Sequence, residues 1–221
     1  AGSGKTRVLV HRINWLLAIE NCFPNAILAV TFTNKAAQEM KARVAEKCQV
    51  DLYKMWIGTF HGLSHKMLRI HHNEANLPED FIIIDSDDQY KLIRKLAKAN
   101  NIDEKQFPIK SIQNFINSHK DRAIRAKNVE AQDNVEQQIM SKVYTLYEKK
   151  LNSENLLDFS ELLLRCYELL KSDDDLRHYY QSKFKHILVD EFQDTNPLQY
   201  SWIKLLTSPQ TKLMTVGDDD Q

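Results

Sequence analysis

The residues with the clearest chemical potential stand near the start of the sequence, where glycines flank a lysine and a threonine in the run 2–6, GSGKT. Glycines allow backbone amides to gather around a phosphate, and the N-terminus of the helix predicted to follow adds partial positive charge. In such a loop Lys5 can reach the β and γ phosphates of a nucleotide, and the Thr6 hydroxyl can ligate Mg²⁺. The full pattern G-x-x-x-x-G-K-[ST] needs a glycine upstream of Ala1, so a chance glycine turn stays an alternative.

Two adjacent carboxylates follow an apolar run late in the sequence. The run 187–189, ILV, predicts a buried strand, and Asp190 and Glu191 come directly after it. A phosphoryl-transfer site needs one acid to hold Mg²⁺, as Asp190 could, and another to deprotonate an attacking water, as Glu191 could. A strand end with acidic caps is the alternative. The combination with GSGKT in one chain favours the phosphoryl-transfer site.

The elements that must position these residues alternate between strand and helix at both ends of the chain. Apolar runs predict strands at 26–32, 55–59, 186–190 and 212–216, with a short one at 81–84. Helical spacing predicts helices at 5–20, 34–48, 60–72, 86–98, 108–120, 135–150, 158–171 and 197–206. Asn34 is a candidate N-cap, and Ser86 with Gln89 forms a candidate capping box. An α/β domain with a parallel sheet, interrupted by a helical insertion, follows from this order.

Five segments of the chain, in order, resemble motifs of the superfamily 1 DNA helicases of the UvrD/Rep/PcrA group. They are AGSGKTR at 1–7, AVTFTNKAAQEM at 29–40, GTFHGL at 58–63, DEFQDTN at 190–196 and VGDDDQ at 216–221. The resemblance covers the whole chain. It implies a RecA-like P-loop domain in two parts, 1–62 and 185–221, interrupted by a mainly α-helical inserted domain of the 1B type at 63–184.

The resemblance also implies roles around ATP and Mg²⁺. Thr6 and Asp190 would hold the metal, and Glu191 would act as the catalytic base. Gln221 would sense the γ-phosphate and couple hydrolysis to movement. Arg7 would pack its planar guanidinium against the adenine. The nucleotide-binding segment would comprise Ala1, Gly2, Ser3, Gly4, Lys5, Thr6 and Arg7.

A second set of residues would lie on single-stranded DNA if the resemblance holds. A groove for single strands needs aromatic faces for bases and polar groups for phosphates, and Phe32 and Phe60 each follow a predicted strand beside hydroxyls. The alternative is that both phenylalanines belong to the core; the resemblance favours DNA contact for Phe32 more than for Phe60. The implied DNA-contacting residues are Phe32, Thr33, Asn34, Thr59, Phe60 and His61.

The function implied by the resemblance is an ATP-dependent DNA helicase and translocase, moving 3′ to 5′ in DNA repair. Its partners would be single-stranded DNA, single-strand/duplex junctions and repair proteins. A second motor domain would follow Gln221, so we expect this chain alone to hydrolyse ATP very slowly. Two alternatives stay open: a motor subunit of a helicase–nuclease complex, and a DNA-binding module without catalysis.

Composition is compatible with this hypothesis without supporting it. The 221 residues carry 30 Lys and Arg against 30 Asp and Glu, so the overall charge gives no sign of nucleic-acid binding. The three cysteines are widely spaced and no apolar run is long enough to span a membrane, which predicts a cytoplasmic protein. One group of basic residues is predicted to form solvated surface, with contact to duplex phosphates as the alternative: Lys110, Lys120, Arg122, Arg125 and Lys127.

Overall fold

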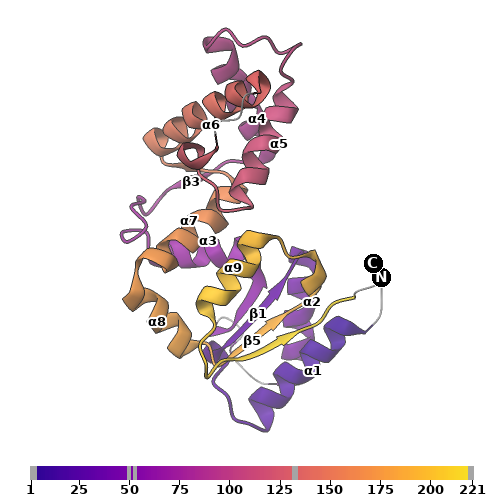
Figure 1. Ribbon diagram of the computed structural model, residues 1–221. Helices are drawn as coiled ribbons and strands as arrows, with labels where there is room; N and C mark the ends of the chain where they lie inside the picture. The colour runs from indigo at the N-terminus through magenta and orange to yellow at the C-terminus, as the bar shows by residue number, and fades with distance from the viewer. Residues whose placement is uncertain (1–3, 49–50, 52–53, 131–133, 219–221) are drawn as a thin grey trace. The chain divides into compact units, whose positions relative to one another are not determined.

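The computed structural model describes residues 4–48, 51, 54–130 and 134–218, and the chain divides into two compact units. Unit 1 comprises residues 1–66, 167–195 and 199–221, and unit 2 comprises residues 67–166 and 196–198. Figure 1 shows strands and helices layered together in unit 1 and mostly helices in unit 2. Within the described ranges, every helix is too short or too polar to cross a membrane.

Unit 1 is built on a parallel sheet of strands β1 (Ile27–Thr31), β2 (Trp56–Thr59), β5 (His186–Val189) and β6 (Lys212–Thr215). The strand order is β2-β1-β5-β6. All five residues of β1 are buried, as expected for a strand covered on both faces. The chain runs from β1 outwards to β2 and from β5 outwards to β6. The order therefore reverses between β1 and β5, where ligands of open parallel sheets usually bind, at the carboxyl ends of the strands.

Helices cover both faces of this sheet. One face packs against α1 (Lys5–Ala18) and α2 (Asn34–Ala45), with Ile27, Ala29 and Leu188 in the shared core. The opposite face carries aromatic side chains: Trp56 packs edge-on against Tyr180 of α8 (Asp174–Lys183), and Phe60 packs edge-on against Trp202 of α9 (Pro197–Leu206). The alternation of β1 and β5 side chains between these two cores fixes the strands in register.

Unit 2 is mainly helical. It contains α4 (Ser86–Ala99), α5 (Ile109–Lys120), α6 (Val135–Glu154) and the short parallel strands β3 (Ile82–Ile83) and β4 (Leu156–Leu157). Its core includes Ile93, Ile112, Ile116, Val143 and Tyr147. Helices α3 (Phe60–Ile70) and α7 (Phe159–Ser172) contribute residues to both units. The short strand predicted at 81–84 is β3, whereas β4 carries no prediction from the sequence.

The boundaries of the two units differ from the domain boundaries predicted from the sequence. Residues 63–66 and 167–184, which the sequence assigns to the insertion, lie in unit 1, and residues 196–198, which it assigns to the RecA-like part, lie in unit 2. The reason is visible at α8, where Tyr180 and the adjoining Phe184 pack on Trp56 of the sheet. Helical spacing alone cannot say which core a helix covers, so the predicted boundary follows the change from strand to helix instead.

Two predicted helix caps are wrong by one residue. Thr33, not Asn34, caps α2, and its hydroxyl accepts a hydrogen bond from the amide of Ala36. Asp85, not Ser86, caps α4, and its carboxylate accepts from the amides of residues 87 and 88. Gln89 is buried and donates to Asn117 and Asp158 instead of forming a capping box. Adjacent residues that can all cap leave the cap position ambiguous in sequence.

Lys120 contradicts the prediction that it lies on a solvated surface. Its side chain is 0% exposed, and its ammonium lies 2.7 Å from Asp158 and 2.9 Å from Glu161. Arg125, also predicted to be solvated, is mostly buried and lies 2.8 Å from the same Glu161. Burial disfavours the charged form of Glu161, but Lys120 and Arg125 outweigh it and hold the pKa of Glu161 well below its ordinary value. Lys110, Arg122 and Lys127 are exposed, as predicted.

We expect Lys120→Met to lower the free energy of unfolding by about 3–5 kcal/mol, because it leaves Asp158 and Glu161 buried without that cation. The measurement is urea denaturation followed by circular dichroism. Lys127→Met, at an exposed position, is the control and should change stability by less than about 0.5 kcal/mol. A loss as small as that of the control would show that the charge network contributes nothing.

The stabilities of the unchanged chain and of Lys120→Met should also differ in their dependence on pH. Because the pKa of Glu161 is lowered on folding, the stability it contributes is present above its ordinary pKa of 4.5 and is lost as the pH falls below that value. In Lys120→Met this lowering is weaker. The difference in stability between the two proteins should therefore be full at neutral pH and should shrink as the medium is acidified below about pH 4.5.

Candidate phosphate and metal site

The carboxyl edge of the unit 1 sheet brings together residues from both ends of the sequence. Gly4 precedes α1 with φ 74°, a left-handed conformation that glycine adopts without steric cost, and α1 begins at Lys5. The first turn of α1 contains no acidic residue, so its free amides and partial positive charge are available to an anion. Asp190 and Glu191 follow β5, and Asp218 lies shortly after β6.

Thr6 and Asp190 are in direct contact although 184 positions separate them in the sequence. The Thr6 hydroxyl donates to a carboxylate oxygen of Asp190 over 2.7 Å. Asp190 is 2% exposed and its backbone amide donates to the carbonyl of Val30, so the neighbouring strand fixes its position. A hydroxyl and a carboxylate, held together beside a helix N-terminus, are the hard oxygen ligands that Mg²⁺ takes in nucleotide sites. The residues present therefore fit the metal.

Burial is the main influence on Asp190. It raises the pKa of this carboxyl, and the negative charge of Glu191 raises it further, while the hydrogen bond from Thr6 opposes both. The net effect is a pKa above the ordinary value. A cation bound at Asp190 would favour the ionised form, which is the expected behaviour of a metal ligand in a partly buried site.

Lys5 connects the two carboxylates that lie further out. Its ammonium lies 3.4 Å from Glu191 and 3.4 Å from Asp218. Burial lowers the pKa of Lys5, but its hydrogen bonds and ion pairs with these acids raise it by more, so the net pKa is above its ordinary value. Lys5 is therefore a cation already held at this edge, and it could exchange its carboxylate partners for phosphate oxygens.

Glu191 is held in an unusual backbone conformation, with φ 47° and ψ 49°. Left-handed geometry costs a non-glycine residue about 1–2 kcal/mol, and most other such residues in the described ranges are asparagines, which tolerate it better. The Glu191 carboxylate accepts a hydrogen bond of 2.8 Å from the Gln193 side chain. That bond is the largest influence on Glu191 and lowers its pKa, with Lys5 adding to it against a smaller effect of burial.

The residues predicted to contact DNA follow β1 and β2 at the same edge. Thr33 and Asn34 are exposed, while Phe32, Thr59 and His61 are half-buried. The Thr59 hydroxyl accepts from the amide of Gly62, so it shapes the start of α3. These two strands are hydrogen-bonded neighbours, which places both segments along one edge.

Phe60 corrects the prediction that it contacts DNA. It is 1% exposed, with its ring edge-on to Phe32 at 5.5 Å and to Trp202 at 5.9 Å. No face of the ring is open to a base. Phe60 instead packs against Phe32 from within the core, so the alternative interpretation, that Phe60 is a core residue, describes it better.

The remaining predicted site residues lie at the two ends of the chain. Ala1, Gly2, Ser3 and Gln221 lie outside the described residues. Arg7 is exposed on the first turn of α1. Two residues of the site, Gln193 and Asp218, are not predicted individually from the sequence. Asp218 is identified only as part of the 216–221 segment. Both lie inside quoted motifs, and that is the only signal that could have identified them.

A parallel α/β domain with a lysine, a hydroxyl and paired carboxylates at one strand edge defines the class of P-loop-like proteins. The chain belongs to the UvrD/REP helicase N-terminal domain family, whose pattern matches residues 1–221. It is 52% identical to DNA helicase II of Escherichia coli, 51% to DNA helicase II of Salmonella typhimurium and 39% to the ATP-dependent DNA helicase PcrA of Staphylococcus epidermidis. The whole chain is covered in each case, and it spans about a third of each relative: 31%, 31% and 30%.

Proposed function

We propose that this chain is the ATP-binding part of a DNA helicase and translocase, acting on single-stranded DNA and junctions, 3′ to 5′, in DNA repair. Unit 1 would be the RecA-like domain, and unit 2 the helical insertion within it. The observation that carries the proposal is the contact of Thr6 with Asp190 and of Lys5 with Glu191. A long intervening chain folds so as to bring the two halves of a phosphoryl-transfer site together.

Each residue of this cluster has a chemical task in the proposal. Lys5 and the amides at the start of α1 bind phosphate oxygens of ATP, and Thr6 with Asp190 holds Mg²⁺. The metal, when bound, neutralises charge on the phosphates. Glu191 orients a water and accepts its proton as that water attacks the γ-phosphorus, while the bond from that phosphorus to the β–γ bridging oxygen breaks and ADP leaves. The lowered pKa of Glu191 keeps it ionised, and therefore able to accept the proton, at neutral pH.

Single-stranded DNA would lie along the edge formed by the segments after β1 and β2. Phe32 offers an aromatic face, and the exposed Thr33 and Asn34 offer polar groups to phosphates. The segment after β1 begins on the strand next to β5, which Asp190 follows, and the segment after β2 begins one strand further along the sheet. A change at the nucleotide could therefore reach the DNA through the strand edge itself, which is what a translocase needs.

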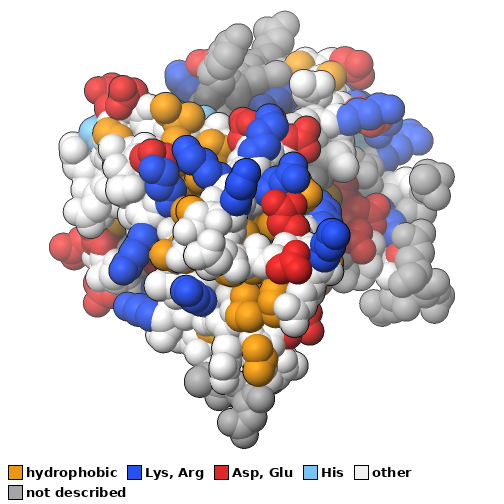
Figure 2. Space-filling model, turned by 90° about the horizontal axis from the view of Figure 1, so that it is seen from above, with side chains coloured by type: hydrophobic (Ala, Val, Ile, Leu, Met, Phe, Trp, Pro, Cys, Tyr) orange, Lys and Arg blue, Asp and Glu red, His pale blue; other side chains and the backbone are white. Residues whose placement is uncertain are grey.

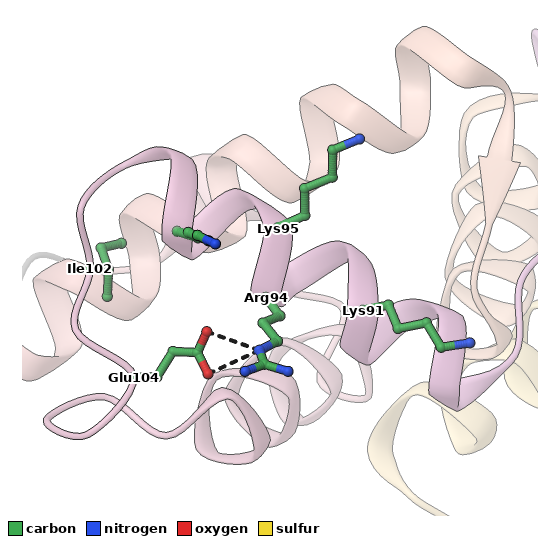
Figure 3. A pocket seen from close by; sticks show the side chains of 6 residues that line it. Lys91, Arg94, Lys95, Ile102 and Glu104 are labelled. Atoms are coloured by element: carbon green, nitrogen blue, oxygen red, sulfur yellow. Dashed lines mark hydrogen bonds and ion pairs between the residues drawn. The ribbon is translucent and has the colours of Figure 1, made fainter.

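Unit 2 carries a basic groove along α4, which we define by Lys91, Arg94, Lys95 and Lys98. Together with Ile102 and Glu104 these residues line a cavity of about 640 Å³. In Figure 3 Lys91 and Lys95 extend away from Glu104, which pairs with Arg94. Figure 2 shows Lys and Arg side chains spread over the face seen from above. The groove, more than the predicted residues Lys120 and Arg125, has the exposed charge that duplex phosphates require.

The function can be tested with the chain and with a full-length protein that carries it. We expect the chain to bind ATP with Mg²⁺, and the longer protein to hydrolyse ATP faster with single-stranded DNA and to unwind a tailed duplex. For Lys95→Ala, the slope of log K against log salt for junction binding should fall by about 1. DNA binding without any effect of nucleotide would contradict the proposal and favour a module without catalysis.

A further inference from the structure

One neutral side chain, Gln193, bridges Glu191 and the segment after β6. Its amide nitrogen donates to Glu191 over 2.8 Å, and its amide oxygen accepts from the backbone amide of Asp218 over 3.1 Å. Only this orientation of the amide satisfies both partners, since the reverse would set an oxygen against a carboxylate. Gln193 therefore makes one specific connection between the ends of β5 and β6.

The backbone around Gln193 is fixed by the same two segments. Gln193 lies in the short helix η4 (Phe192–Asp194), and the Phe192 amide donates to the carbonyl of Val216 over 2.9 Å. Gly217 leaves the space that the side chain occupies. A Cβ at position 217 would lie 2.7 Å from the Gln193 amide oxygen, closer than real contacts allow, so any larger residue there must displace the Gln193 side chain.

Lys5 also connects Glu191 with the segment after β6, but through ion pairs. It lies 3.4 Å from both Glu191 and Asp218, the two residues that Gln193 also bridges. Phosphate oxygens arriving at the start of α1 would compete for the Lys5 ammonium. Gln193 carries no charge for phosphate to attract, so it can keep Glu191 and the 216–218 segment connected after Lys5 has turned to the nucleotide.

We propose that Gln193 is a positioning residue that aims the Glu191 carboxylate at the attacking water and couples it to the 216–218 segment. The proposal rests on the function proposed above. It requires that Gln193 hold the Glu191 carboxylate in place, which the 2.8 Å hydrogen bond between them does. It also requires that Glu191 need external support, which fits its left-handed backbone and its partly exposed side chain.

The test uses Gln193→Met in a full-length protein carrying this chain, since methionine keeps the length and loses both hydrogen bonds. We expect kcat for ATP to fall about 10- to 100-fold with KM within about threefold, because the base is misaimed while the phosphate contacts stay. The split between kcat and KM separates misaiming of the base from a general loss of structure, which would raise KM as well. Gln210→Met, at an exposed loop position, is the matched control and should change neither.

Gly217→Ala provides a second route to the same defect, because it displaces Gln193 without altering its chemistry. It should lower kcat with little change in KM, and it keeps the proposal testable if Gln193→Met fails to fold. An unchanged kcat in a folded variant would overturn the proposal. Lys5→Ala separates the two ideas: if it still hydrolyses ATP normally, the proposed function is wrong, whatever Gln193 does.

Discussion

Glu191→Gln is expected to reduce ATP turnover by the full-length protein about 10³-fold or more while leaving ATP binding intact. The amide has nearly the same shape, but it cannot accept the proton of the attacking water. Lys5 and Thr6, which bind the phosphates and the metal in our proposal, are unchanged. Binding of ATP should be equal or tighter, because Lys5 loses a carboxylate, 3.4 Å away, that competes with phosphate for its charge.

Single-turnover hydrolysis and equilibrium binding of a fluorescent ATP analogue separate these effects. Glu46→Gln makes the same chemical change at an exposed position near the C-terminal end of α2 and is the matched control. Normal turnover in Glu191→Gln would show that another group deprotonates the water. Loss of binding together with turnover would assign Glu191 to the nucleotide pocket instead of to the chemical step.

The sequence predicts those parts of the site in which the chemically active residues are adjacent in the chain. GSGKT combines glycine, lysine and hydroxyl in one run, and the acids at 190 and 191 directly follow an apolar strand. The acids end a predicted strand and GSGKT opens the first predicted helix, and the family resemblance, which places both motifs at one nucleotide, predicts that the two runs meet. The contact between Thr6 and Asp190 agrees with that expectation.

Gln193 shows what such reasoning misses. Its partners are Glu191 and the amide of Asp218, 25 positions further along the chain. Neither a period nor a spacing signals a side-chain amide that bridges two loops, and glutamine is common on surfaces. The bridge exists only because β5 and β6 pair in register and Gly217 leaves room for it. Information of this kind belongs to the tertiary structure.

The burial of Lys120, in contrast, could have been predicted from the sequence. On α5 the buried residues Ile109, Ile112, Ile116 and Lys120 recur at helical spacing, so the lysine lies on the apolar face. Charge suggests a solvated residue, whereas its place on the helix indicates burial. The position on the face decides here because Asp158 and Glu161 supply two buried carboxylates to offset the cost of removing the ammonium from water.

The second large effect is expected for Lys5→Ala, which should lower the affinity of the chain for ATP with Mg²⁺ by about 100-fold and reduce turnover by the longer protein to background. The variant removes the only charge that we assign to the β and γ phosphates. It also leaves Glu191 and Asp218 facing the incoming phosphates with no cation between them. Repulsion between these acids and the triphosphate then adds to the lost attraction.

The fold should survive this change. The side chains of Glu191 and Asp218 are 37% and 35% exposed, so water can solvate both acids once Lys5 is gone, and such pairs contribute little to stability. Titration with a fluorescent ATP analogue measures the affinity, and thermal unfolding checks the fold. Lys47→Ala, at an exposed position, is the matched control and should bind as the unchanged chain does. Single-stranded DNA binding should persist, because Phe32, Thr33 and Asn34 lie on a different strand end. An unaltered ATP affinity in a folded Lys5→Ala chain would mean that the glycine-flanked segment does not bind triphosphate.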